Sequence, residues 1–141
     1  MIDAVLAKLL NSDDATDIKA GLADYNGGKA IFSVALPDDC AFPAILITQD
    51  GGQDWGCREN EGGVIVASVQ IFDDKSFTKK EVRALAGKIW RLINRHDLEP
   101  WITEAGYENW GCFADPPLNT NDGLGFPGYT IRVNVRVLRA A

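Results

Sequence analysis

An acidic, glycine-rich segment, residues 50–63, holds side chains of the type that bind calcium. Asp50, Asp54 and Glu61 fall at positions 1, 5 and 12 of the calcium-loop template. The template needs a glycine at position 6 for its sharp turn, but Trp55 stands there, and no helix is predicted on either side. The segment is therefore predicted to be a solvated acidic loop between two strands, without a bound metal.

A second segment, Gly123–Gly128, has the letters of the G-x-G-x-x-G nucleotide fingerprint. That fingerprint binds a pyrophosphate where a strand precedes it and a helix follows it, so that the phosphates meet the helix N-terminus. In this chain Pro127 interrupts the motif and a β-branched run follows it. We expect a loop at this point and no nucleotide cofactor.

The side chains that acid–base or nucleophilic catalysis requires are few. His96 is the only histidine, and no serine stands in the G-x-S-x-G signature of an activated nucleophile. The cysteines Cys40, Cys57 and Cys112 are odd in number and share no C-x-x-C spacing, which indicates a reducing compartment and not a disulfide framework. We therefore predict that the protein is not an enzyme.

Two tripeptides repeat the letters Trp-Gly-Cys, beginning at Trp55 and at Trp110. Their tryptophans are expected to pack on each other or on a partner. The alternative is that these tryptophans form an aromatic pocket in a small ligand-binding domain or enzyme. A ligand screen by thermal shift would test this alternative.

Hydrophobic periodicity predicts the helices that position these residues. Apolar spacings of three and four over residues 2–24 predict one amphipathic helix, or two short helices broken near residue 12, which Asn26-Gly27-Gly28 ends. A second helix, residues 76–96, begins with the capping box Thr78–Glu81. Its predicted apolar stripe consists of Val82, Leu85, Ala86, Ile89 and Ile93.

Short β-branched or alternating runs predict the strands, with a loop over residues 116–127. The element order predicts a single α+β domain, residues 1–141, in which two main helices cover one face of a largely antiparallel sheet. We expect Ile65, Val69, Ile71, Ile131, Val133 and Val135 on the covered face, against Leu85, Ile89 and Ile93. The predicted strands are residues 30–36, 44–48, 64–72, 100–103, 107–113 and 129–138.

The formal net charge of −6 is unevenly distributed along the chain. Residues 1–74 carry thirteen acidic and four basic side chains, whereas residues 75–96 carry seven basic and one acidic. An acidic protein repels nucleic acid unless basic charge gathers on one face. The basic helix is interpreted as a solvated face, with contact to protein or to phosphate as alternatives, and the segregated charge favours contact between neighbouring copies.

We interpret the loop over residues 50–63 as an assembly surface. Its glycines make ordering costly in the free chain, so that a partner must supply contacts before it settles. Trp55 is the expected anchor, because a large aromatic side chain contributes most at the desolvated centre of an interface. The candidate assembly residues are Asp50, Asp54, Trp55, Arg58, Glu59, Glu61, Lys79, Arg83, Arg91, Arg132 and Arg136.

The order of these elements resembles the tail terminator (tail completion) proteins of long-tailed bacteriophages and phage-like particles. After a leading helix comes a strand that ends in a proline, and then a proline that opens an apolar strand. A further strand, a long helix with Ala86 and Ile89, and a closing strand follow. The segments that carry the resemblance are Ala30–Pro37, Phe42–Ile47, Val66–Phe72 and Tyr129–Val137.

The resemblance implies a ring, usually of six copies, that docks on the last disc of the tail tube protein and stops its polymerisation. The other face of the ring would meet the head–tail connector proteins, and DNA would pass through the bore only in transit. No catalysis, cofactor or membrane contact is implied. The expected location is the virion tail, after assembly in the host bacterial cytoplasm. A head–tail connector or neck protein of similar fold is the alternative.

Overall fold

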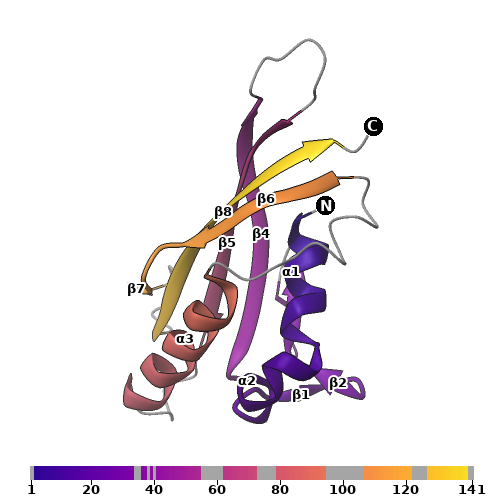
Figure 1. Ribbon diagram of the computed structural model, residues 1–141. Helices are drawn as coiled ribbons and strands as arrows, with labels where there is room; N and C mark the ends of the chain where they lie inside the picture. The colour runs from indigo at the N-terminus through magenta and orange to yellow at the C-terminus, as the bar shows by residue number, and fades with distance from the viewer. Residues whose placement is uncertain are drawn as a thin grey trace.

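Helices cover one face of a mostly antiparallel sheet, and this arrangement confirms the predicted α+β class (Figure 1). The computed structural model describes residues 2–33, 36–37, 39, 41–54, 62–72, 79–94, 107–121 and 127–139. In the view of Figure 1 the helices lie in front of the lower part of the sheet, and the ribbon of β4 and β5 extends beyond them.

The main sheet has the strand order β3-β4-β5-β8-β6, and β7 also pairs with β8. The strands β3 and β4 are parallel, and the other paired strands are antiparallel. Strand β8 lies between β5 on one side and both β6 and β7 on the other. The bounds are β3 Ile31–Ser33, β4 Ala44–Asp54, β5 Gly62–Phe72, β6 Tyr107–Ala114, β7 Leu118–Asn121 and β8 Pro127–Arg139.

The N-terminal segment forms two short helices, as the second of the two sequence alternatives predicts. Helix α1, Ile2–Leu10, is followed by the 3-10 turn η1, Asp13–Ala15, and by α2, Thr16–Ala20. The Ser12 hydroxyl donates to the carbonyl oxygen of Leu9 over 2.6 Å, so that one of the orphan carbonyls at the end of α1 is satisfied. This local bond favours a break after α1.

The segment 26–28 does not end a helix, contrary to the sequence prediction. It joins two short strands, β1 (Asp24–Tyr25) and β2 (Gly28–Lys29), which pair with each other as a small antiparallel hairpin. Asn26 and Gly27 both have positive φ, 47° and 82°. A two-residue hairpin turn of type I′ needs positive φ at both central positions, and Asn-Gly is the pair that supplies it most easily.

The predicted loop over residues 50–63 is shorter in the structure. Strand β4 continues to Asp54 and β5 begins at Gly62, with a bulge in their pairing between Gln49 and Gly51. Glycine is unfavourable within a strand. Gly51 and Gly52 of β4 are nevertheless part of the strand, because they pair with the β-branched Val66 and Ile65 of β5. Residues 55–61 lie outside the described part of the chain.

The predicted loop over residues 116–127 contains the short strand β7. Its four residues pair with the first residues of β8, from Leu118 opposite Thr130 to Asn121 opposite Pro127. The sequence Leu-Asn-Thr-Asn has no alternation of apolar residues that would predict a strand. Tertiary pairing, and not intrinsic preference, makes it a strand. The strand predicted at residues 100–103 lies outside the described residues.

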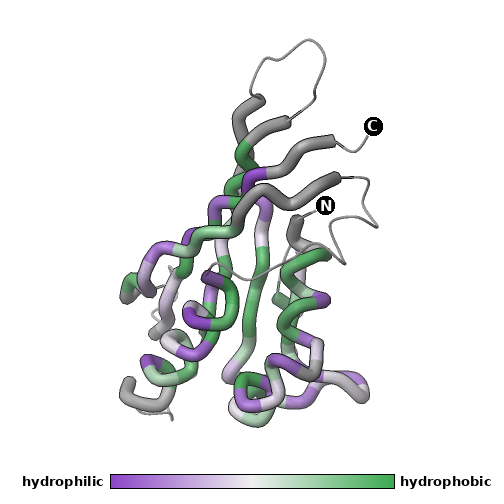
Figure 2. Tube along the Cα trace, in the orientation of Figure 1, coloured by the Kyte–Doolittle hydropathy of each residue, from purple (hydrophilic) through white to green (hydrophobic). Residues whose placement is uncertain are grey.

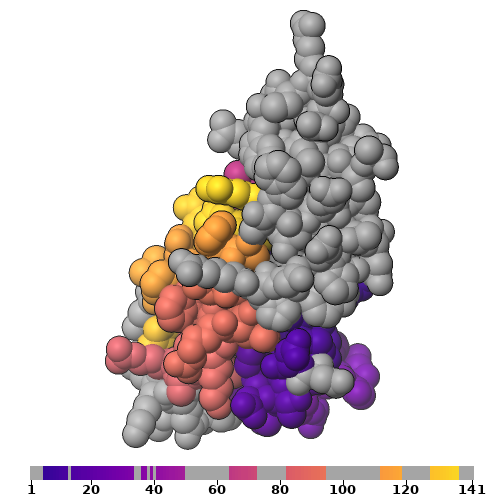
Figure 3. Space-filling view, viewed as in Figure 1, coloured from indigo at the N-terminus to yellow at the C-terminus, as the bar shows by residue number. Residues whose placement is uncertain are grey.

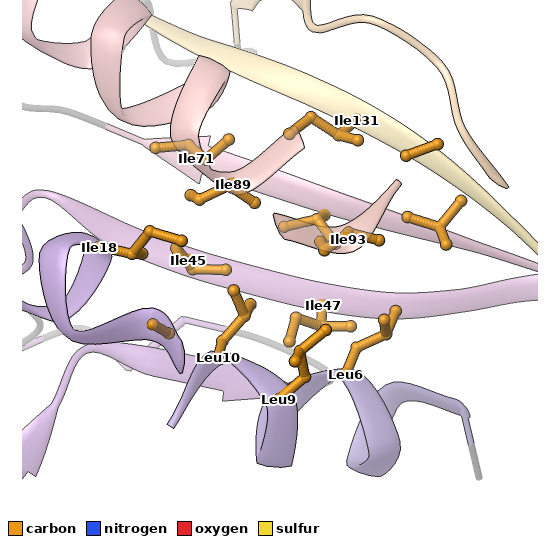
Figure 4. Close-up of a cluster of buried hydrophobic side chains, with 14 of the residues drawn as sticks. Leu6, Leu9, Leu10, Ile18, Ile45, Ile47, Ile71, Ile89, Ile93 and Ile131 are labelled. Carbon is orange, nitrogen blue, oxygen red and sulfur yellow. The ribbon is translucent and has the colours of Figure 1, made fainter. Parts of the chain in front are cut away.

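The core lies between the sheet and the two longest helices (Figures 2 and 4). Ile89 and Ile93 of α3, Lys79–Ile93, extend toward Ile71 and Ile131 of the sheet. The predicted stripe of α3 is buried, and so are the predicted sheet residues except Ile65, which is half-buried against the core. The α1 side chains that pack toward Ile45 and Ile47 of β4 include Leu6, Leu9 and Leu10.

Three hydrogen bonds attach the C-terminal part of α3 to β6. The indole Nε1 of Trp90 donates to the carbonyl oxygen of Ala114 over 2.9 Å, and the Ala114 N–H donates to Asn94 Oδ1 over 3.0 Å. The Cys112 thiol donates to the carbonyl oxygen of Ile93 over 3.4 Å. The helix is therefore held against both the centre and one margin of the sheet.

Replacing Ile89 with alanine tests the helix-on-sheet packing. The side chain is fully buried, and its truncation leaves a cavity, so that the free energy of unfolding should fall by about 2–5 kcal/mol. Urea denaturation of parent and variant measures the difference. The exposed neighbour gives the control, because Arg91→Ala should change the free energy of unfolding by less than about 0.5 kcal/mol. Equal stability of Ile89→Ala and the parent would contradict the packing.

Candidate assembly surfaces

The sheet face away from the helices carries exposed arginines of β8. Arg132 and Arg136 are exposed there and alternate with the buried Ile131, Val133 and Val135, as the sequence predicts. The Arg136 guanidinium lies 5.6 Å from the ring centroid of Phe113 on the neighbouring strand β6, within the range of a cation–π contact. We call this surface the open face of the sheet.

At one margin of the open face, side chains from β5, β7, β8 and the β6–β7 turn surround a hollow of about 380 Å³. Leu118 is 67% exposed, and it and Phe113 are the two large hydrophobic side chains that are exposed among the described residues. The Asp115 N–H donates to the carbonyl oxygen of Arg132 over 2.9 Å, so that an acidic and a basic residue are held side by side. We call this surface the β7 flank: Ser68, Asp115, Pro116, Leu118, Thr130 and Arg132.

The predicted basic face of α3 lies on the other side of the molecule. Arg83, Lys88 and Arg91 are exposed on this helix, which packs on the covered face of the sheet. The arginines of α3 and those of β8 therefore belong to two surfaces that point in opposite directions. The sequence prediction placed them in one set, and the structure divides that set in two.

A groove of about 430 Å³ lies where α2 meets α3. Figure 3 shows the atoms of α3 beside those of the indigo N-terminal helices on this face of the molecule. Its base is apolar, with the buried side chains of Pro43, Val82 and Leu85. Asp17 of α2 and Lys88 of α3 line it from the two helices, and both are exposed. We call this surface the α2–α3 groove: Asp17, Ala20, Gly21, Pro43, Val82, Ala84, Leu85 and Lys88. Sequence reasoning missed it because its two helices come from distant segments.

The structure places the other predicted assembly residues only in part. Asp50 and Asp54 lie on β4 and Lys79 begins α3, and in each case the backbone is described and the side chain is not. The same holds for Trp110 on β6. Outside the described residues lie Trp55, Arg58, Glu59 and Glu61, and also His96.

The described residues contain no group of three or more His, Cys, Asp or Glu side chains that could hold a metal ion. The nucleotide fingerprint over Gly123–Gly128 runs directly into strand β8, which begins at Pro127. A strand therefore follows the motif where a dinucleotide site needs a helix. In the described part of the chain, no helix combines the length and apolar character that a membrane span requires.

Cys112 is buried on β6 and is not placed for nucleophilic chemistry. Burial away from water disfavours the thiolate and raises the pKa of the thiol from 9.0 to about 12. Reactive cysteines have lowered pKa values and access to solvent. Its role in this structure is the sulfur contact to Ile93 at the end of α3.

Comparison with known proteins shows the fold. No protein-family model and no curated protein matches the sequence. Among solved structures, the chain is similar to a chain of the "Virion of native gene transfer agent (GTA) particle", with a TM-score of 0.74 and 14% sequence identity. The match covers 97% of this chain and 94% of that chain. The fold of this protein is therefore one that occurs in a virion particle.

The raised pKa of Cys112 predicts a loss of stability at high pH. Between about pH 9 and pH 12 the thiol of the unfolded chain ionises while the folded chain keeps its proton, so that ionisation favours unfolding. Below pH 9 this contribution is fully present. Urea unfolding at about pH 8 and about pH 10.5 should show a larger fall in stability for the parent than for Cys112→Ala, in which the other titrating groups are unchanged. Equal falls in both proteins would contradict the prediction.

Proposed function

We propose that the protein is a structural component of a phage-like virion that acts as a tail terminator. The observation that carries the proposal is the fold, which matches a chain of a gene transfer agent virion over nearly the full length of both chains. The element order in the sequence, which resembles tail terminator proteins, supports the same assignment. Its partners would be further copies of itself, the tail tube protein and the head–tail connector proteins.

In this role the protein works by docking and without catalysis. A closed ring needs heterologous contacts, in which one surface of a copy meets a different surface of its neighbour. The described residues include two separate surfaces with charged and apolar side chains, the β7 flank and the α2–α3 groove. Such a ring would stop polymerisation of the tube at one face and meet the connector at the other, with DNA passing through the bore.

A head–tail connector or neck protein of similar fold is the second candidate. A likeness of fold at 14% identity does not separate the two roles. They differ in what the ring binds, because a terminator limits the length of growing tail tubes and a connector does not. Tube length is therefore the measurement that distinguishes them.

The first test is the mass of the assembled protein. Six copies of the 15.4 kDa chain give about 92 kDa, and we expect native mass spectrometry to find this species and negative-stain images to show rings. When the protein is added to growing tail tubes of the same particle, the tubes should become shorter. Rings that leave tube length unchanged would favour the connector role. A protein that stays monomeric, alone and with tubes, would contradict both.

The second test concerns Trp55, the expected anchor of the assembly segment. Replacing a central aromatic side chain with alanine removes much of the energy of an interface. We expect Trp55→Ala to lower the fraction of capped tubes while the Tm stays that of the parent. The matched control is Asn60→Ala in the same segment, which should cap as the parent does. Equal capping by Trp55→Ala and the parent would show that the segment has another purpose.

A further inference from the structure

The open face of the sheet has a polar centre. The buried side chains of β4, β5 and β8 point toward the helices, so that the residues between them point to the open face. The register places Thr48, Ser68 and Arg132 side by side across the three strands, with Gln70 and Thr130 in the next row. We call this group the polar patch, and all its members are half-buried or exposed: Thr48, Ser68, Gln70, Thr130, Arg132 and Asn134.

The polar patch consists of side chains that commonly bind the phosphates and sugars of nucleic acids. In protein–DNA complexes these groups are contacted by arginine, lysine, serine, threonine, asparagine, glutamine and tyrosine. Every member of the patch belongs to these types, and none is acidic. The core of a protein–protein interface is instead rich in aromatic side chains and poor in serine. The patch therefore fits an anionic backbone better than the centre of a protein contact.

Two guanidinium groups on β8 supply positive charge at this face. Arg132 and Arg136 are both exposed, and the rise of a strand separates them by about 13 Å. The structure records no ion pair between either arginine and another described residue. Arg132 lines the hollow of about 380 Å³ together with Ser68 and Thr130, so that a guanidinium and two hydroxyl groups border one space. A phosphate group bound there would meet both charge and hydrogen-bond donors.

The basic face of α3 is a poorer site for the same ligand. Its exposed basic residues are separated by Ala84 and Gly87, which have no polar side-chain atoms. Lys88 also lines the α2–α3 groove together with the acidic Asp17. A phosphate backbone on α3 would therefore meet charge without the additional donors that the polar patch supplies.

We propose that the polar patch, together with Arg136, contacts the phosphate backbone of duplex DNA. The inference rests on the proposed ring, in which the open face of each copy would line the bore. Contacts to phosphate carry no sequence information, and a net charge of −6 repels DNA from the rest of the chain, so that the contact is weak. A weak contact that is independent of sequence lets DNA slide through the bore.

Binding of the full-length protein to a short, labelled linear duplex tests the contact by fluorescence anisotropy. At low salt, Arg132→Gln/Arg136→Gln should raise the Kd about tenfold or more, and the slope of log Kd against log salt should fall by about 1 for each arginine. The matched control is Arg83→Gln/Arg91→Gln, which makes the same change in net charge on the other side of the fold. Its Kd should stay within about threefold of the parent.

The acidic residue beside the patch gives a test in the opposite direction. Asp115 lines the same hollow as Arg132, and its carboxylate disfavours a phosphate there. Asp115→Asn should therefore lower the Kd about threefold, whereas Asp17→Asn, the same charge change on α2, should leave it nearly unchanged. All the replaced side chains are exposed, so that each variant should keep the Tm of the parent.

The outcomes separate this contact from the ring. A parent that does not bind the duplex at low salt, or β8 and α3 pairs that lose binding equally, would overturn the contact and leave the ring standing. Poly-glutamate that binds as tightly as DNA, with the same dependence on Arg132 and Arg136, would also overturn it and assign the face to an acidic protein. A monomeric parent whose DNA binding depends on the two arginines would support the contact and overturn the ring.

Discussion

Strand β8 pairs along both of its edges, with β5 on one side and with β6 and then β7 on the other. A strand in this position has no free edge, and its side chains can only point to one face of the sheet or the other. Its apolar and charged residues alternate, so that the apolar ones lie on one face of the sheet and the charged ones on the other. The strands that pair with β8 share these two faces. The buried Ile131, Val133 and Val135 require a cover of helices, and α3 supplies it.

Two helices, α1 and α3, cover the apolar face of the sheet, and they pack mainly on different strands. Helix α1 packs over β3 and β4 with leucines, and α3 packs over β5, β6 and β8 with buried side chains that include Ala86, Ile89 and Ile93. The Trp90 indole donates to the Ala114 carbonyl and the Ala114 N–H donates to Asn94 Oδ1, and these two bonds hold the end of α3 to β6 at the sheet margin. The groove lies where α2, which follows α1 after η1, contacts α3.

The parts of the fold that could be predicted are those whose pattern is complete within one segment. The stripe of α3 repeats at helical spacing, and the alternation of β8 repeats at strand spacing, so that each pattern indicates both the element and its buried side. Strand β7 and the far half of β4 could not be predicted this way. Both are polar or glycine-rich, and they are strands because β8 and β5 offer paired partners. The sequence prediction for Asn26 and Gly27 is wrong because the same residue types that form a type I′ turn also end helices.

The candidate surfaces also include one part that the sequence predicts and one part that only the structure shows. The exposure of Arg132 and Arg136 follows from the alternation of β8, and that of Arg83 and Arg91 follows from the stripe of α3. The groove joins residues from α2 with residues from α3, far apart in the sequence, and only the packed structure brings Asp17 and Lys88 to one place. For Leu118 the sequence held a weak signal, an isolated apolar residue between a proline and an asparagine in a polar segment.

The acidic excess of the chain constrains how copies can associate. A net charge of −6 makes neighbouring copies repel one another at long range, so that association needs short-range contacts that outweigh the repulsion. Basic side chains that face acidic ones supply such contacts only where the two surfaces fit closely. Buried apolar surface supplies the rest of the favourable free energy of association, and it does so independently of charge. Salt then acts in two opposite directions, since it screens the repulsion between whole copies and also weakens the paired charges at the contact. A contact with an apolar centre keeps most of its strength under both effects.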